Sequence, residues 1–279
     1  WEKMAEETLA IYENFLNRFP ETNPFQRNPD DYDLIVPLLS THWVVTDKDK
    51  YRKKTALIWY QPNEGGYYDD LAGIAATTPL AEKSLKGKKY HSLRFGIDTS
   101  LFNSFNFKKE DEVLHVGMVG NLYNPRRMTK TVINALKDLE GVKLMLYPSQ
   151  PPKTEHDLEL LGGGTEIMQY IVSGSKYWTG LPNIYNSLDV LIRCDSDPGY
   201  SFPVLEAAAC GVPVIATNSG IDHTITGAGG ILIDGDREYY LNHEEEVGQK
   251  VRDAVIWMRD HTNERTLLGL NARQEVFWE

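Results

Sequence analysis

The stretch from Asp195 to Gly220, DSDPGYSFPVLEAAACGVPVIATNSG, decides the fold. It follows an apolar run over Val190–Cys194 that has the length and composition of a buried strand. A glycine-containing loop comes next, then a short helix over Phe202–Cys210 closed by Gly211, and then a second strand over Val212–Thr217. This order is typical of a parallel sheet, in which ligands bind at the carboxyl ends of the strands.

The same alternation extends in both directions from this stretch. Spacings of three and four apolar residues predict helices, and short apolar runs predict strands. The expected elements are strands at Val113–Val119, Val142–Tyr147 and Gly230–Asp234, a helix over Pro125–Leu139, and a helical tail from about Glu244. Residues 153–176 hold helical and strand-like pieces that three consecutive glycines prevent us from separating. Residues 106–279 are therefore expected to form a doubly wound α/β domain.

The first 105 residues carry a weaker pattern of the same kind. Predicted strands lie at Thr55–Tyr60, Leu71–Ala76 and Tyr90–Leu93, and predicted helices at Glu2–Arg18 and near Pro79–Leu85. So few strands predict a reduced α/β domain over residues 1–105. We place the domain boundary in the loop-like segment at 98–110.

The composition excludes several classes of protein. With 279 residues and 41% hydrophobic content, the chain can build real cores. It contains no apolar run long enough to span a membrane, and its net charge of -11 argues against nucleic acid as a partner. The two cysteines, Cys194 and Cys210, lie in apolar surroundings without metal-ligand spacing. They are expected to be reduced core residues of a cytoplasmic protein.

The charge is unevenly distributed. Residues 1–110 carry 15 basic and 16 acidic groups, and the remainder carries 14 and 24. Basic clusters lie at residues 48–54 and 83–89. Such runs are usually solvated faces, and contact with an acidic acceptor or a membrane surface is the alternative. Nothing in the sequence predicts the oligomeric state.

Two predicted helix starts could bind an anion. Free N–H groups at the helix beginning at Phe202 form one such site, and Glu206 lies one turn inside, in reach of ribose hydroxyls. At the other, Asn124 is a good N-cap, and Arg126 and Arg127 follow directly. Because cations gain nothing from the positive end of a helix, these arginines indicate an anionic ligand, with exposed arginines as the alternative.

Two further motifs concern other classes of protein. Gly117 and Gly120 fit a close approach of the backbone, but they do not form GxGxxG, which argues against a dinucleotide dehydrogenase. The triplet Asp195-Ser196-Asp197 spells DxD, a pattern that can clamp a cation. We interpret this triplet as a coincidence and expect neither a metal nor any other cofactor.

Four segments resemble family-4 retaining glycosyltransferases of the two-Rossmann GT-B architecture. VGNLYNPRRMTKTVINAL and SFPVLEAAACGVPVIATNSG are similar to the donor-binding half of that family. RFGIDTSLF resembles the connector between its domains, and NARQEVFWE resembles its closing helix. The resemblance covers about residues 113–234 and implies a GT-B-like fold with a reduced N-terminal domain.

The resemblance also implies roles for individual residues. Glu206 would bind the donor ribose, and Asn121 stands where the family usually has arginine. Arg126 or Arg127 stands where the family has lysine. The whole expected donor site comprises Gly120, Asn121, Arg126, Arg127, Gly199, Tyr200, Ser201, Phe202 and Glu206. Pro198 stands where the family carries the first glutamate of a pair.

The acceptor side is less defined. The segment from Trp59 to Gly66 is similar to an "IQDxE" segment in rhamnosyl-type members, which makes Gln61 and Glu64 candidate cleft residues. His42 is a further candidate, and a plain loop or packing role is the alternative for all three. No residue of the chain is identified as a nucleophile or base.

The resemblance therefore implies metal-independent transfer of a hexose or deoxyhexose from a nucleotide-sugar to a hydroxyl of a sugar or glycoconjugate, with retention. Two alternatives stay open. A glycosyltransferase-like module that binds nucleotide or sugar without turnover is favoured by Pro198, Asn121 and the short front domain. A nucleotide-sugar epimerase would share the two-domain build and would need no acceptor.

Overall fold

The structure, a computed structural model, describes residues 56–59, 73–76, 82, 85, 87–92, 96–104, 112–149, 154–161, 175–196, 201–218 and 227–278. The chain divides into two compact units, residues 1–57 with 69–72 and residues 58–68 with 73–279. The helix predicted at Glu2–Arg18, and nearly all of the one predicted near Pro79–Leu85, lie outside the described residues.

A small sheet contains three short strands with the order β1-β2-β3. They are β1 (Ala56–Trp59), β2 (Gly73–Ala76) and β3 (His91–Ser92), and β2 and β3 are parallel. Each strand falls within a run that the sequence predicts as a strand, so these three predicted strands are confirmed.

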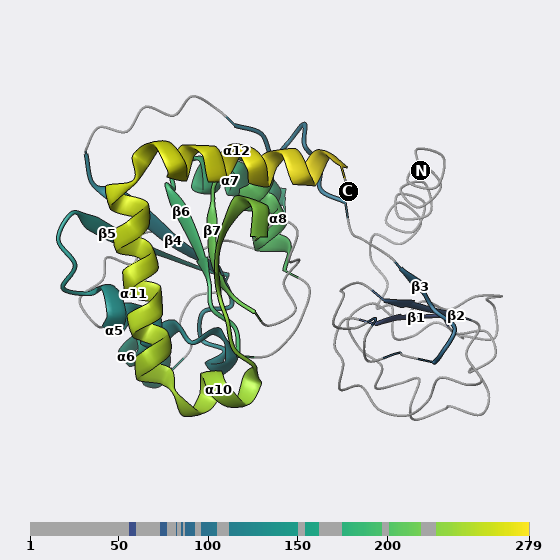
Figure 1. Ribbon diagram of the computed structural model, residues 1–279, viewed down its shortest axis with the longest axis horizontal. Helices are drawn as coiled ribbons and strands as arrows, with labels where there is room; N and C mark the ends of the chain where they lie inside the picture. Colours follow the sequence, from purple (N-terminus) through teal and green to yellow (C-terminus); the bar gives the residue numbers. More distant parts are fainter. Residues whose placement is uncertain are drawn as a thin grey trace. The chain divides into compact units, whose positions relative to one another are not determined.

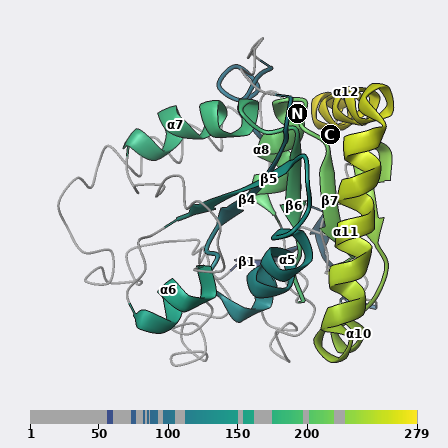
Figure 2. The same cartoon turned by 90° about the vertical axis from the view of Figure 1, so that its left-hand side faces the viewer.

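The second sheet has five strands in the order β5-β4-β6-β7-β8, and every neighbouring pair is parallel (Figures 1 and 2). The strands are β4 (Leu114–Gly120), β5 (Val142–Pro148), β6 (Val190–Arg193), β7 (Val214–Thr217) and β8 (Gly230–Ile233). All five were predicted, with ends shifted by one or two residues. The chain leaves β4 toward β5 on one side and reaches β6 on the other, so the order reverses between β4 and β6.

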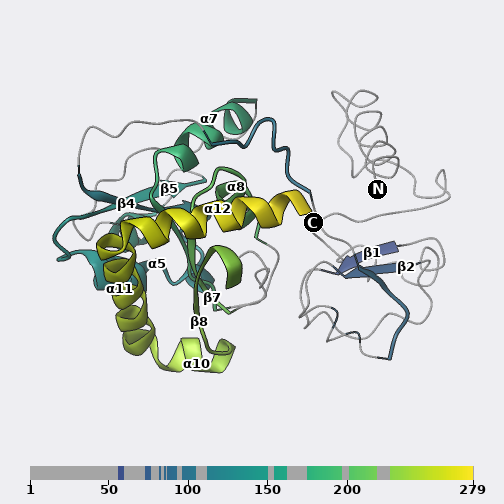
Figure 3. The same ribbon diagram turned by 45° about the horizontal axis from the view of Figure 1, so that its top comes forward.

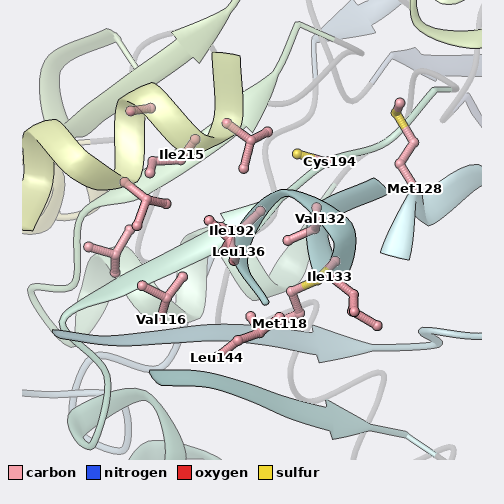
Figure 4. Close-up of a cluster of buried hydrophobic side chains, with 14 of the residues drawn as sticks. Val116, Met118, Met128, Val132, Ile133, Leu136, Leu144, Ile192, Cys194 and Ile215 are labelled. Atoms are coloured by element: carbon pink, nitrogen blue, oxygen red, sulfur yellow. The ribbon is translucent and has the colours of Figure 1, made fainter. Parts of the chain in front are cut away.

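Helices cover both faces of this sheet (Figure 3). On one face, α5 (Thr129–Leu136) and α11 (Glu244–Asp260) pack on alternate strand residues such as Val116 and Ile192 (Figure 4). On the other, α7 (Ser175–Asn186) and α8 (Phe202–Ala209) cover the intervening residues. Strands buried on both faces read as unbroken apolar runs, which is why they were visible in the sequence.

The helices differ from the prediction in three places. The predicted helix over Pro125–Leu139 is a 3-10 turn, η4 (Pro125–Arg127), followed by α5, because Met128 between them adopts a left-handed backbone with φ 50°. The predicted tail is two helices, α11 and α12 (Thr262–Trp278). The helices that the sequence did not separate or predict are α6 (Glu155–Leu161), α7 and α10 (Arg237–Asn242).

Residues 96–104, which overlap the predicted boundary segment 98–110, are held by local hydrogen bonds and by packing on the core between the sheet, α7 and α8. The Asp98 carboxylate accepts hydrogen bonds from the backbone N–H groups of Ser100 (2.9 Å) and Leu101 (3.2 Å). The Ser100 hydroxyl also donates to this carboxylate at 2.6 Å, and it is the main reason why the pKa of Asp98 lies below its usual value, with the backbone bonds adding to the effect. Phe102 is fully buried and lies 6.2 Å from the Tyr185 ring. The connector therefore belongs structurally with the five-stranded domain.

Helix α12 turns away from the end of α11 and runs beside α8 (Figures 1 and 3). Its Arg273 Nη1 donates to the Ala209 carbonyl at the end of α8 (2.8 Å). A methyl group on Gly269 would overlap the carbonyl oxygen of Gly211. Gly211 itself has φ 76°, a left-handed conformation that ends a helix and suits glycine. The two backbones therefore meet closely at this point.

Two findings concern the environment of the chain. Cys194 and Cys210 are free and buried, as predicted. Within the described part of the chain, no helix is both long and apolar enough to cross a membrane.

We predict that Gly269→Ala lowers stability although alanine favours helices. The overlap with Gly211 must be relieved by a backbone shift, at a cost of about 1–3 kcal/mol. Gly248→Ala in α11 is the matched control, since its new methyl group would lie 3.5 Å from Thr131 Cγ2, an ordinary contact. Urea denaturation measures both variants. A Gly269→Ala protein as stable as Gly248→Ala would contradict the close contact.

Candidate functional site

The site lies where the strand order reverses, at the carboxyl ends of β4 and β6. In open parallel sheets this point is where ligands bind, because the connections on either side leave in opposite directions. Gly120 ends β4 and has φ 121°, a backbone conformation that requires glycine. Arg193 ends β6 on the neighbouring strand. The described ones among the predicted donor residues, such as Asn121 after β4 and Ser201 after β6, therefore follow strands that end at one edge of the sheet.

An ion-pair cluster joins the loops at this edge. Asp195 Oδ2 lies 2.6 Å from Arg193 Nε, and it also accepts a hydrogen bond from Arg127 Nη1. The Arg193 and Asp195 side chains are 8% and 10% exposed, whereas that of Arg127 is 25% exposed. Two guanidinium groups therefore share one carboxylate oxygen in a largely water-excluded position, where charge interactions are strong.

Backbone bonds fix the same loops. The Ser196 N–H donates to the Arg126 carbonyl at 2.8 Å. Thr217, fully buried at the end of β7, accepts from the Asp195 N–H and donates to the Asp195 carbonyl, at 2.8 and 2.7 Å. The carboxyl ends of β4, β6 and β7 are thus tied together around residue 195.

The structure places the predicted anion-binding residues after β4 as follows. Asn124 caps η4 through a bond from the Arg126 N–H to its side chain at 3.1 Å, which confirms the predicted N-cap. Arg126 and Asn121 are exposed at the surface, whereas Arg127 is committed to the ion pair with Asp195. Arg127 is therefore not simply an exposed residue at a helix start.

Gly117 has a structural role. A methyl group at this position would overlap the side chain of Leu188, which packs in the second core. The close approach anticipated at Gly117 is therefore an approach of the protein core to the strand.

Helix α8 presents its N-terminus at the end of the loop that follows β6. Ser201 is its N-cap residue and is buried, and none of the described residues bonds its hydroxyl oxygen. Phe202, the first helical residue, is 41% exposed. A buried hydroxyl without a partner among the described residues, at the N-terminus of a helix, suits an anionic ligand.

Glu206 lies one turn inside α8 and is only 2% exposed. The Tyr185 hydroxyl of α7 donates to its Oε2 at 2.5 Å, and no described residue donates to Oε1. Burial raises the pKa of Glu206 to about 7, and the bond from Tyr185 partly opposes that rise. The carboxyl group therefore titrates near neutral pH, with one oxygen left for a ligand.

The DxD triplet is only partly described, because Asp197 lies outside the described residues. The described residues contain no group of three or more His, Cys, Asp or Glu side chains arranged to hold a metal ion. Asp195, the first residue of the triplet, is paired with two arginines.

Several predicted residues lie outside the described part of the chain. Gly199 and Tyr200 lie outside the described residues, together with Pro198 and Asp197. The candidate acceptor residues His42, Gln61 and Glu64 also fall outside. Their roles stay predictions.

Sequence reasoning missed two residues of the site. Arg193 lies within the run predicted as a buried strand, and an arginine at the end of such a run is itself a signal of a buried charge pair. Tyr185 lies on α7, a helix that the sequence did not predict, so its contact with Glu206 carried no signal.

We predict a pH-dependent stability that originates in Glu206. Since its pKa rises on folding from 4.5 to about 7, ionisation opposes the folded state between these values. This contribution is fully present below about pH 4.5 and is lost by pH 7, a change of at most about 3 kcal/mol. Melting temperatures from pH 5 to 8 should fall less steeply in Glu206→Gln than in wild type. Parallel curves would contradict the assignment.

The architecture defines the class of protein. The five-stranded parallel sheet with helices on both faces, together with the partly described three-stranded sheet, is the GT-B glycosyltransferase fold. Residues 113–246 match the family model described as Glycosyl transferases group 1, which spans slightly less than half of the chain. No curated protein sequence matches the chain significantly.

Solved structures share this fold. Sucrose-phosphate synthase from Thermosynechococcus elongatus matches with a TM-score of 0.70 and 15% identity, over 89% of this chain and 69% of that one. A glycosyltransferase from Rickettsia africae matches with a TM-score of 0.67 and 16% identity, over 95% and 82%. Anabaena HepE, solved with UDP and glucose, matches with a TM-score of 0.67 and 16% identity, over 89% and 74%. At these identities the likeness shows the fold. The fold and the family match support a glycosyltransferase.

Proposed function

We propose that the chain is a retaining, family-4 type glycosyltransferase. It transfers a hexose or deoxyhexose from a nucleotide-sugar to a hydroxyl of a sugar or glycoconjugate. The observation that carries this proposal is the convergence of an arginine cluster and the N-terminus of α8 at the reversal of strand order. HepE, which shares the fold, has been solved with UDP-glucose, and this supports a nucleotide-sugar as the donor.

Each part of the site has a role in this reaction. The diphosphate leaves with negative charge, which the Arg126 and Arg127 guanidinium groups and the helix terminus at Ser201 neutralise in a site with restricted water. Glu206, with Oε1 toward the ligand, accepts from the ribose hydroxyls. Fixed positive groups can stabilise the charge of the diphosphate as a metal ion would. We therefore propose a reaction that needs neither metal nor cofactor. We place it in the cytoplasm, since both thiols are free.

A second function is favoured by one specific observation. Pro198 replaces the acidic residue expected from the family pattern, and Asn121 replaces an arginine. A chain that has lost these groups could bind the nucleotide-sugar without transferring the sugar. The two functions differ in turnover: release of nucleoside diphosphate that depends on an added acceptor supports the transferase, and binding without release supports the binding module.

The first test of the donor site is calorimetry with UDP, GDP, dTDP, ADP and NAD. One nucleoside diphosphate should bind, and Glu206→Gln should weaken it by about 1.5–3 kcal/mol, the loss expected for a hydrogen bond to a charged group. The affinity for inorganic pyrophosphate should not change, because Glu206 is assigned to the ribose. Glu245→Gln on the exposed start of α11 is the matched control. Binding of NAD alone, or of no nucleotide, would contradict the proposal.

A further inference from the structure

Arg193 is an unusual end for a buried strand. The three residues before it in β6 are apolar and almost fully buried, and its own side chain is only 8% exposed. Removing a guanidinium from water costs several kcal/mol unless charge pairing and hydrogen bonds compensate. We therefore expect a buried arginine at this position to have a functional role, such as ligand binding, that an apolar residue could not have.

The charges of Arg127, Arg193 and Asp195 do not balance one another. Arg127 and Arg193 are both held by Asp195, so these three side chains carry one positive charge in excess. A guanidinium has five N–H donors in a planar fork, and Asp195 forms its ion pair on the Nε side of Arg193 without a hydrogen bond to Nε. The cluster can therefore still accommodate an anion.

The position of the fork indicates where that anion would bind. Arg193 Nη1 lies 3.9 Å from the place that a Cβ on Gly120 would occupy, so the guanidinium lies at the end of β4. Gly120 carries no side chain there, which leaves its backbone open to close approach. Asn121, the next residue, is where the resemblance predicts an arginine. Arg193 thus brings a positive charge from the neighbouring strand to the point where the expected one is missing.

We propose that Arg193 binds the diphosphate of the donor, with Asp195 as the positioning residue that holds it beside Arg127. This inference rests on the proposed function for the identity of the ligand. Its physical basis, a largely buried pair of guanidinium groups sharing one carboxylate at the strand-order reversal, is independent of that function.

The test measures binding of inorganic pyrophosphate, and of UDP and GDP against UMP and GMP, by calorimetry at constant ionic strength. Wild type is compared with Arg193→Gln and Arg259→Gln. Arg259 is the matched control because it loses the same charge, but donates to the Glu140 carbonyl before β5, at the opposite edge of the sheet.

Arg193→Gln should weaken pyrophosphate about 10- to 100-fold, the loss expected for a charge-assisted bidentate contact. It should reduce the preference for diphosphate over monophosphate by a similar factor. Arg259→Gln should stay within about twofold of wild type, because exposed charges at that distance are screened. Unchanged pyrophosphate binding in Arg193→Gln overturns the inference.

The outcomes separate this inference from the proposed function. Pyrophosphate binding that depends on Arg193, without any binding of nucleotide, keeps the anion site and rejects the glycosyltransferase. Nucleotide binding that is unchanged in Arg193→Gln agrees with the proposed function and rejects the inference. A wild type that binds neither rejects both.

A second variant covers the case in which Arg193→Gln does not fold. Asp195→Asn leaves the two guanidinium groups without their shared carboxylate, so like charges destabilise the folded state. Pyrophosphate would replace the missing negative charge. It should therefore raise the melting temperature of Asp195→Asn more than that of wild type. An equal or smaller rise would mean that the cluster is closed to ligands, and would overturn the inference.

Discussion

The carboxylate of Asp195 holds the candidate site together. It pairs with Arg193 at the end of its own strand and with Arg127 in the loop after β4, while the backbone of Asp195 is bonded on both sides to Thr217. Three parallel strand ends are thereby fixed around one residue. Because charges in this largely buried position interact strongly, the carboxylate also decides which guanidinium donors remain for a ligand.

The same edge of the sheet combines charge with the other requirements of nucleotide binding. Gly120 ends β4 in a conformation that requires glycine, and the buried Ser201 hydroxyl caps α8 without a partner among the described residues. Glu206 adds a carboxyl group whose pKa lies near neutrality because it is buried. Binding of ribose hydroxyls favours its ionised form, so donor binding should release a proton around pH 7. Donor binding and the protonation state of Glu206 are therefore coupled.

The sequence predicted the five-stranded domain well, because strands buried on both faces are unbroken apolar runs that end at turn residues. The prediction of helices was wrong or incomplete where tertiary contacts, and not local sequence, determine the structure. Met128 interrupts a helix whose apolar spacing is continuous, and α7 has a proline inside it and weak periodicity. At the site, Arg126, Arg127 and Glu206 were predicted from local pattern, whereas Arg193 was not. The partners Asp195 and Tyr185 were not predicted either, since an ion pair between residues 127 and 195 has no signature in either segment.

The central claim is that the diphosphate binds at the carboxyl ends of β4 and β6. Hydrogen–deuterium exchange with and without the tightest-binding nucleoside diphosphate tests it most directly, since it locates the ligand without any substitution. The account predicts slower exchange in residues 120–127, 193–196 and 201–206, and no change in residues 137–141 and 187–189 at the opposite edge. Protection confined to the opposite edge, or none at all under saturating ligand, would contradict it.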